Sequence, residues 1–74
     1  MNQQQMTMDD IFISSVVDGE MFAFARQSGA NKTWPPKIMH EGVVYELQEE
    51  WVLPSGLGGN FVYSAKYWSV LSGV

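Results

Sequence analysis

Apolar and polar residues alternate at a period of two from Val43 to Leu53, which is the spacing of a β-strand that buries one face. The odd positions are apolar apart from Glu49, and the even positions are mostly polar. A similar alternation runs from Phe61 to Leu71, after the glycine-rich segment LPSGLGGNF. The two stretches predict two long strands joined as an antiparallel hairpin, because matching alternations can share one buried face.

One register brings the aromatic residues of this hairpin together. It places Leu53 opposite Phe61, Trp51 opposite Tyr63, Leu47 opposite Tyr67, and Gln48 opposite Lys66. Glu49 would then face Ala65 on the apolar side, where burial favours a protonated carboxyl and makes it a candidate general acid. We favour the alternative, a β-bulge near Gln48 or Glu49 that turns this charge outward.

A turn signal also divides the first half of the chain. Asp18-Gly19 lies between two apolar runs and predicts a type I′ hairpin that joins residues 11–17 to residues 20–26. A short helix over residues 19–29 is the alternative, since Glu, Met, Ala, Arg and Gln all favour helices.

Two further patterns complete the expected elements. Glu41-Gly42 predicts another hairpin, between residues 37–40 and the strand that begins at Val43. The sequence TMDD at residues 7–10 fits a capping box, but the β-branched run IFISSVV that follows it favours a strand.

These elements predict an all-β fold. We expect a small antiparallel sheet of four to five strands, curled or closed into an SH3- or OB-like barrel, with at most one short helix. The chain of 74 residues is long enough for one small domain, which we place at residues 9–74. Residues 1–8 lack periodicity and contain three consecutive glutamines, so we expect a flexible N-terminal tail.

The composition argues against several chemistries. There is no cysteine, and therefore no disulfide, thiolate zinc site or thiol nucleophile. His40 is the only histidine; no serine has the context of a nucleophile, and no spacing matches a metal site. We predict a protein that is not an enzyme and binds no cofactor or metal. No membrane-spanning or secretory segment is evident, so we expect a cytoplasmic location.

The glycine-rich segment does not match a nucleotide-binding motif. It lacks the third glycine of the dinucleotide fingerprint, and a strand rather than a helix follows it. We predict a hairpin loop. The alternative is a lid whose backbone amides, at Gly58, Gly59 and Asn60, close over a ligand.

Charge is unevenly distributed along the chain. The net charge is -4, yet residues 26–37 contain three bases and no acid. Arg26, Lys32 and Lys37, with Trp34 among them, could hold a small anionic ligand of the nucleotide type by charge and stacking. The alternative is that the segment Trp34-Pro35-Pro36 packs back as a hydrophobic plug. The acidic total makes duplex nucleic acid an unfavourable partner.

Trp68 is a large aromatic residue on the otherwise polar face of the last strand. It shares that face with Val44, Val62 and Val70, which together form a candidate interface for another copy of the chain. The alternative is a second core, in which another element of the chain covers this face. Small size without disulfides favours a homo-oligomer.

In its general character the chain is similar to the small accessory proteins that bacteriophages encode to disable host factors. The similarity implies a binding or inhibitor protein, an anti-defence or host-takeover factor that sequesters a nucleotide-type ligand or blocks a host protein. One alternative is a single-stranded nucleic-acid binder of OB or SH3-like type, with exposed tyrosines and Trp68 as stacking platforms. Another is a small virion or assembly protein.

Overall fold

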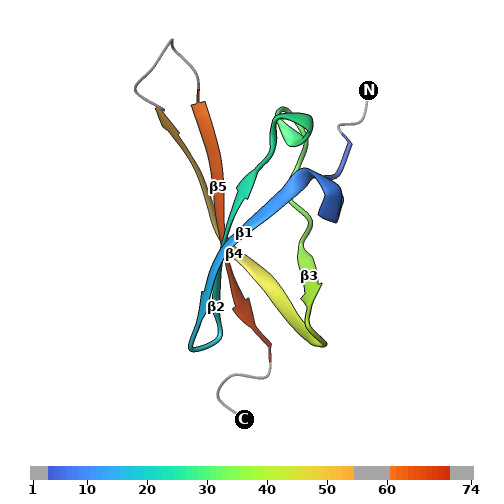
Figure 1. Cartoon of the computed structure of the whole chain (residues 1–74), viewed down its shortest axis with the longest axis vertical. Helices are drawn as coiled ribbons and strands as arrows, with labels where there is room; N and C mark the ends of the chain where they lie inside the picture. Colours follow the sequence, from blue (N-terminus) through green and yellow to red (C-terminus); the bar gives the residue numbers. More distant parts are fainter. Residues whose placement is uncertain (1–3, 55–60, 71–74) are drawn as a thin grey trace.

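A computed structural model describes residues 4–54 and 61–70 of the chain. Its strands form one antiparallel sheet in the order β1-β2-β5-β4-β3, curled into a half-barrel (Figure 1). The strands are β1 (Ile11–Val17), β2 (Glu20–Ala25), β3 (Lys37–His40), β4 (Val43–Pro54) and β5 (Phe61–Ser69). The all-β prediction is confirmed, and the sheet curls without closing into a barrel.

Both short hairpins have the predicted turn. Asp18 and Gly19 have φ angles of 53° and 81°, and Glu41 and Gly42 have φ angles of 51° and 80°. Positive φ at both central residues is the conformation of a type I′ turn, which matches the right-handed twist of the paired strands. The strand interpretation of residues 20–25 is thereby confirmed over the helix. The described helical segments are two 3₁₀ turns, η1 (Met8–Asp10) and η2 (Gln27–Gly29).

A β-bulge changes the register of the long hairpin between β4 and β5. Leu47 pairs with Tyr67 as predicted, but beyond the bulge Glu49 pairs with Lys66 and Trp51 pairs with Ser64. The predicted pairs from Gln48 to Leu53 are therefore wrong by one residue, because the bulge adds one residue to β4. The favoured explanation for Glu49 is confirmed: its carboxylate turns away from the core and lies 3.7 Å from Lys66 Nζ.

The sheet has an inner face that carries the core. Tyr67 and Ala65 of β5 and Met21 and Ala23 of β2 are all fully buried there. Alternation beyond the bulge exchanges the faces of β4, so Val52 points inward and Trp51 outward. One end of the inner face is covered by Met6, Trp34 and Ile38, which are buried in the same cluster.

Residues 4–6 lie along the loop that precedes β3. The Met6 N–H donates to the Thr33 carbonyl (2.8 Å), and the Thr33 N–H donates to the Gln4 carbonyl (2.9 Å). Met6 is only 3% exposed. The sequence predicted a flexible tail over residues 1–8; within it, the bonds to Thr33 and the burial of Met6 join residues 4–6 to the rest of the domain, and residues 1–3 lie outside the described part of the chain.

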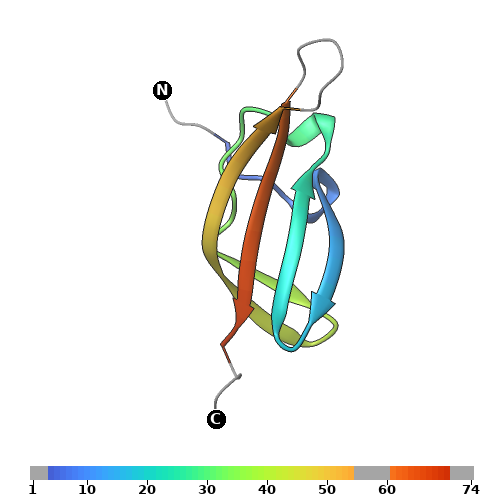
Figure 2. The ribbon, with the colours of Figure 1, turned by 90° about the vertical axis from the view of Figure 1, so that its left-hand side faces the viewer.

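The other side of the sheet, which we call the outer face, is turned toward the viewer in Figure 2. No described helix or loop crosses it. The strand register assigns it a set of large apolar side chains from four strands: Phe12, Phe22, Phe24, Val44, Trp51, Leu53, Val62 and Trp68.

Candidate functional site

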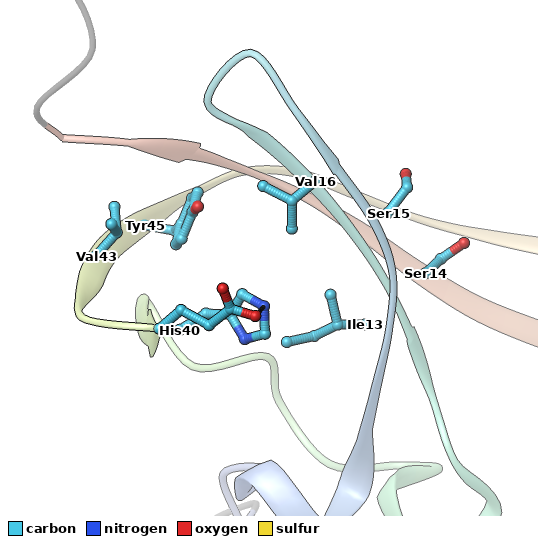
Figure 3. A pocket seen from close by; sticks show the side chains of 8 residues that line it. Ile13, Ser14, Ser15, Val16, His40, Val43 and Tyr45 are labelled. Carbon is cyan, nitrogen blue, oxygen red and sulfur yellow. Dashed lines mark ion pairs between the residues drawn. The ribbon is translucent and has the colours of Figure 1, made fainter.

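A groove of about 550 Å³ opens on the inner face, at the end that Met6 and Trp34 leave uncovered. It lies between the β1–β2 hairpin and the β3–β4 hairpin (Figure 3). This volume is within the usual range for a binding pocket of roughly 300–1,000 Å³. The groove is lined by Ile13, Ser14, Ser15, Val16, His40, Glu41, Val43 and Tyr45.

The groove has apolar walls and polar edges. Figure 3 shows Ile13 and Val16 projecting from β1 toward Tyr45 and His40, whereas Ser14 and Ser15 point away. A register shift between Ile13 and Ser15 explains this arrangement. Because β1 has a bulge there, Ile13 and Val16 face the same side although they are three residues apart.

The two walls of the groove come from the two edges of the sheet. β1 is the first strand in the sheet order and β3 is the last, so each has one side without a neighbouring strand. An edge strand presents backbone N–H and C=O groups that can pair with an added strand. The groove therefore combines apolar side-chain contacts with backbone hydrogen-bonding groups.

The ionisable side chains at the groove are those of His40 and Glu41. The His40 Nε2 atom lies 3.5 Å from Glu41 Oε2, and the Glu41 side chain is 83% exposed. None of the described residues that line the groove is a lysine or an arginine. Among the described residues, no group of three His, Asp or Glu side chains could hold a metal ion.

The predicted basic cluster is divided among separate partners. Lys32 Nζ lies 3.2 Å from Asp10 Oδ2, and Lys37 Nζ lies 3.7 Å from Glu46 Oε2. The Arg26 guanidinium lies 5.7 Å from the centroid of an aromatic ring of β1 on the outer face. The structure does not bring the three cations together around one open site.

Trp34 is part of the core. This is the alternative interpretation, in which residues 34–36 pack back as a hydrophobic plug. It is 7% exposed, and its ring meets that of Tyr67 edge to face with 6.3 Å between centroids. A buried ring offers no open plane on which a base could stack. The tyrosines also lack the exposure that was expected: Tyr45 and Tyr67 are buried and Tyr63 is partly buried.

The other predicted site residues lie elsewhere. Gly58, Gly59 and Asn60 are outside the described residues. Val44, Val62 and Trp68 share the outer face, and Trp68 is 44% exposed. Val70 follows β5, and its N–H donates to the Val44 carbonyl at 3.0 Å.

Sequence reasoning missed most of the groove. Of the lining residues, the sequence patterns indicated only His40, the turn at Glu41 and the apolar face of β4. A signal was present in the two predicted short hairpins, since a curled sheet brings hairpins at its edges toward each other. Ile13 and Val16 could not be assigned to one face without the bulge in β1.

Comparisons of the chain with protein families, with curated proteins and with solved structures find no match. In the described part of the chain, no helix has the length and apolar character required to cross a membrane.

Proposed function

We propose that this chain is a non-enzymatic binding protein that holds an extended segment of a partner protein in the groove, and so blocks that partner. The observation that carries the proposal is the position of the groove between the two edge strands, β1 and β3. An extended segment can add to such an edge through backbone hydrogen bonds, while its alternate side chains enter the groove.

The chemistry of the walls supports a peptide with apolar and basic residues. Ile13, Val16, Val43 and Tyr45 supply apolar surface, and Glu41 supplies an exposed negative charge at the edge. Because the described lining residues include no lysine or arginine, they offer an anionic nucleotide no lysine or arginine to neutralise its phosphates. A segment that alternates apolar residues with lysine or arginine fits both features.

The proposal is tested by selection from a displayed library of short random peptides. We expect enrichment of sequences that alternate apolar and basic residues. Val16→Arg should weaken binding of the enriched peptides by about tenfold or more, because an added cation would fill an apolar wall and repel basic residues. Val16 is 39% exposed, so the domain should tolerate this change.

Val17→Arg is the matched control. Val17 is the next residue of β1, is 61% exposed, and pairs with Glu20 on the outer face. Peptide affinity should stay within about twofold of that of the wild-type chain. Enrichment that Val16→Arg does not reduce, or calorimetry showing a nucleotide bound through Lys32 and Lys37, would contradict the proposal.

Blocking by occupancy needs no catalytic group. This mode of action agrees with one of the functions predicted from the sequence, an inhibitor that blocks a host protein. We propose that it acts in the cytoplasm, since a chain without cysteine does not need an oxidising compartment in order to fold.

A further inference from the structure

We propose that a second copy of this chain docks on the outer face, forming a symmetric dimer. The groove lies on the inner face, so a dimer built in this way would leave both grooves open. The inference goes beyond the proposed function and does not depend on it.

A row of paired residues crosses four neighbouring strands on the outer face, and three of its four members are aromatic. Phe12 of β1 pairs with Phe24 of β2. Ser64 of β5 pairs with Phe24 on one side and with Trp51 of β4 on the other. Phe12 is 51% exposed and Trp68, farther along β5, is 44% exposed. Exposed aromatic side chains that share one sheet face are typical anchors of protein interfaces.

The charges of the outer face cancel. Three acids and three bases lie on it: Glu20, Glu46, Glu49, Arg26, Lys37 and Lys66. The three negative and three positive side chains sum to zero, so the net charge of -4 is carried by the rest of the chain. Two neutral faces can meet without like-charge repulsion, whereas a strongly charged partner would find no complementary charge here. The outer face therefore favours a second copy over a nucleic acid.

The order of charges along β2 also suits a two-fold axis. Glu20 begins the strand, Arg26 follows its last residue, and Ala23 lies midway between them. An axis that crosses β2 at Ala23 places Glu20 of each copy opposite Arg26 of the other. The same axis brings the Phe22 and Phe24 side chains of the two copies together.

Sedimentation equilibrium tests the proposal on the full chain. We expect the wild-type protein to show twice the 8.3 kDa mass of one chain. Phe12→Asp should weaken association by about tenfold or more, because it places an unpaired charge in an apolar interface. The matched control is Phe61→Asp, since Phe61 is 60% exposed and pairs with Pro54 on the inner face. It should leave association unchanged, and circular dichroism should show that both variants are folded.

A charge exchange tests the two-fold arrangement. Glu20→Arg and Arg26→Glu should each weaken association, and the double variant should restore it to near the wild-type value. Added salt should weaken the dimer only modestly, because it screens the Glu20–Arg26 pairs between the two copies but not the contacts between apolar side chains.

A wild-type chain that remains a monomer up to millimolar concentration would overturn the proposal. So would a Phe61→Asp variant that dissociates as readily as Phe12→Asp, since the interface would then not be the outer face. Failure of the double variant to restore association would overturn the axis at Ala23. None of these results would alter peptide binding to the groove, which is measured separately with Val16→Arg.

Discussion

The Tyr67 hydroxyl donates a hydrogen bond of 2.7 Å to the carbonyl oxygen of Pro35, and so joins the middle of the sheet to the loop that covers it. Tyr67 is fully buried, and this burial raises the pKa of its hydroxyl above the ordinary value. The Trp34 ring packs against the Tyr67 ring at an angle of 64°. One polar and one aromatic contact therefore hold the loop over the core.

Tyr67→Phe should reduce the free energy of unfolding by about 1–2 kcal/mol, since the ring is kept but the Pro35 carbonyl loses its donor. Urea unfolding followed by tryptophan fluorescence measures the change. Tyr63→Phe is the control, because Tyr63 is partly buried and no hydrogen bond joins its hydroxyl to a described residue. Equal effects of the two variants would show that the bond to Pro35 contributes nothing.

Trp34→Ala should destabilise the domain by about 3–5 kcal/mol, because it removes a large side chain from the core. A domain of this size has little stability to lose, so the variant should be largely unfolded by circular dichroism. Trp68→Ala, at a position that is 44% exposed, should stay folded. A folded Trp34→Ala chain would contradict the plug interpretation.

The strands and turns of this fold follow from local patterns. Asp18-Gly19 and Glu41-Gly42 specify tight turns because each pair adopts positive φ at both positions. Period-two alternation then indicates which residues can share a face. Neither signal depends on distant parts of the chain, which is why both could be interpreted from sequence.

The site depends on features that local patterns do not contain. A bulge in β4 moves Trp51 to the outer face, and a bulge in β1 lets Ile13 and Val16 share the inner face. Each bulge reflects a balance between the pairing of one strand and the burial of side chains on its neighbours. Burial of Trp34 likewise depends on the space that the curled sheet leaves above Tyr67. From sequence, the bulge in β4 and the burial of Trp34 were therefore only alternatives, and the bulge in β1 was not predicted.

Gly29→Ala should destabilise the domain by about 1–3 kcal/mol through overpacking. A Cβ atom at this position would lie 3.0 Å from both the Cβ atom and the carbonyl oxygen of Asp10, and 3.4 Å from Met6 Sδ. Gly42→Ala is the comparison, since Gly42 has a φ of 80° and open space around its Cα. Asn tolerates positive φ, so Gly42→Asn should recover stability relative to Gly42→Ala, whereas Gly29→Asn should not. Recovery by Gly29→Asn would contradict the steric explanation.

Asp10 links the N-terminal segment to the loop, and its pKa is lowered from 3.8 to about 2. The main cause is the Thr7 N–H, which donates to Asp10 Oδ2 at 2.9 Å; a hydrogen bond from the Ser28 side chain and the nearby Lys32 ammonium add to it. A pKa lower in the folded than in the unfolded chain stabilises the fold above pH 3.8, and this stabilisation is lost as the pH falls from 3.8 toward 2.

Asp10→Asn should therefore lower the Tm at neutral pH and flatten its decline between pH 4 and about 2. Thermal unfolding across this range measures both effects. Asp18→Asn, in the exposed β1–β2 turn, should keep the pH profile of the wild-type chain. Identical acid profiles for Asp10→Asn and the wild-type chain would show that Asp10 is not the group responsible.

Ser64→Ala should leave the domain as stable as the wild-type chain or stabilise it by about 1 kcal/mol. The Ser64 side chain is 1% exposed between Phe24 and Trp51, and its Oγ atom has no hydrogen-bond partner among the described residues. A buried hydroxyl without a partner keeps its desolvation cost, which alanine removes.

The measurement is best made on the Phe12→Asp background, so that dimer association does not contribute to the unfolding free energy. Ser15→Ala, at an exposed position of β1, is the control and should change stability by less than about 0.5 kcal/mol. A loss of more than about 1 kcal/mol in Ser64→Ala would mean that the hydroxyl makes a stabilising bond. The free energy of unfolding of this variant therefore decides between two explanations. Either the buried Ser64 hydroxyl lowers stability because it has no hydrogen-bond partner among the described residues, or it raises stability through a bond of its own.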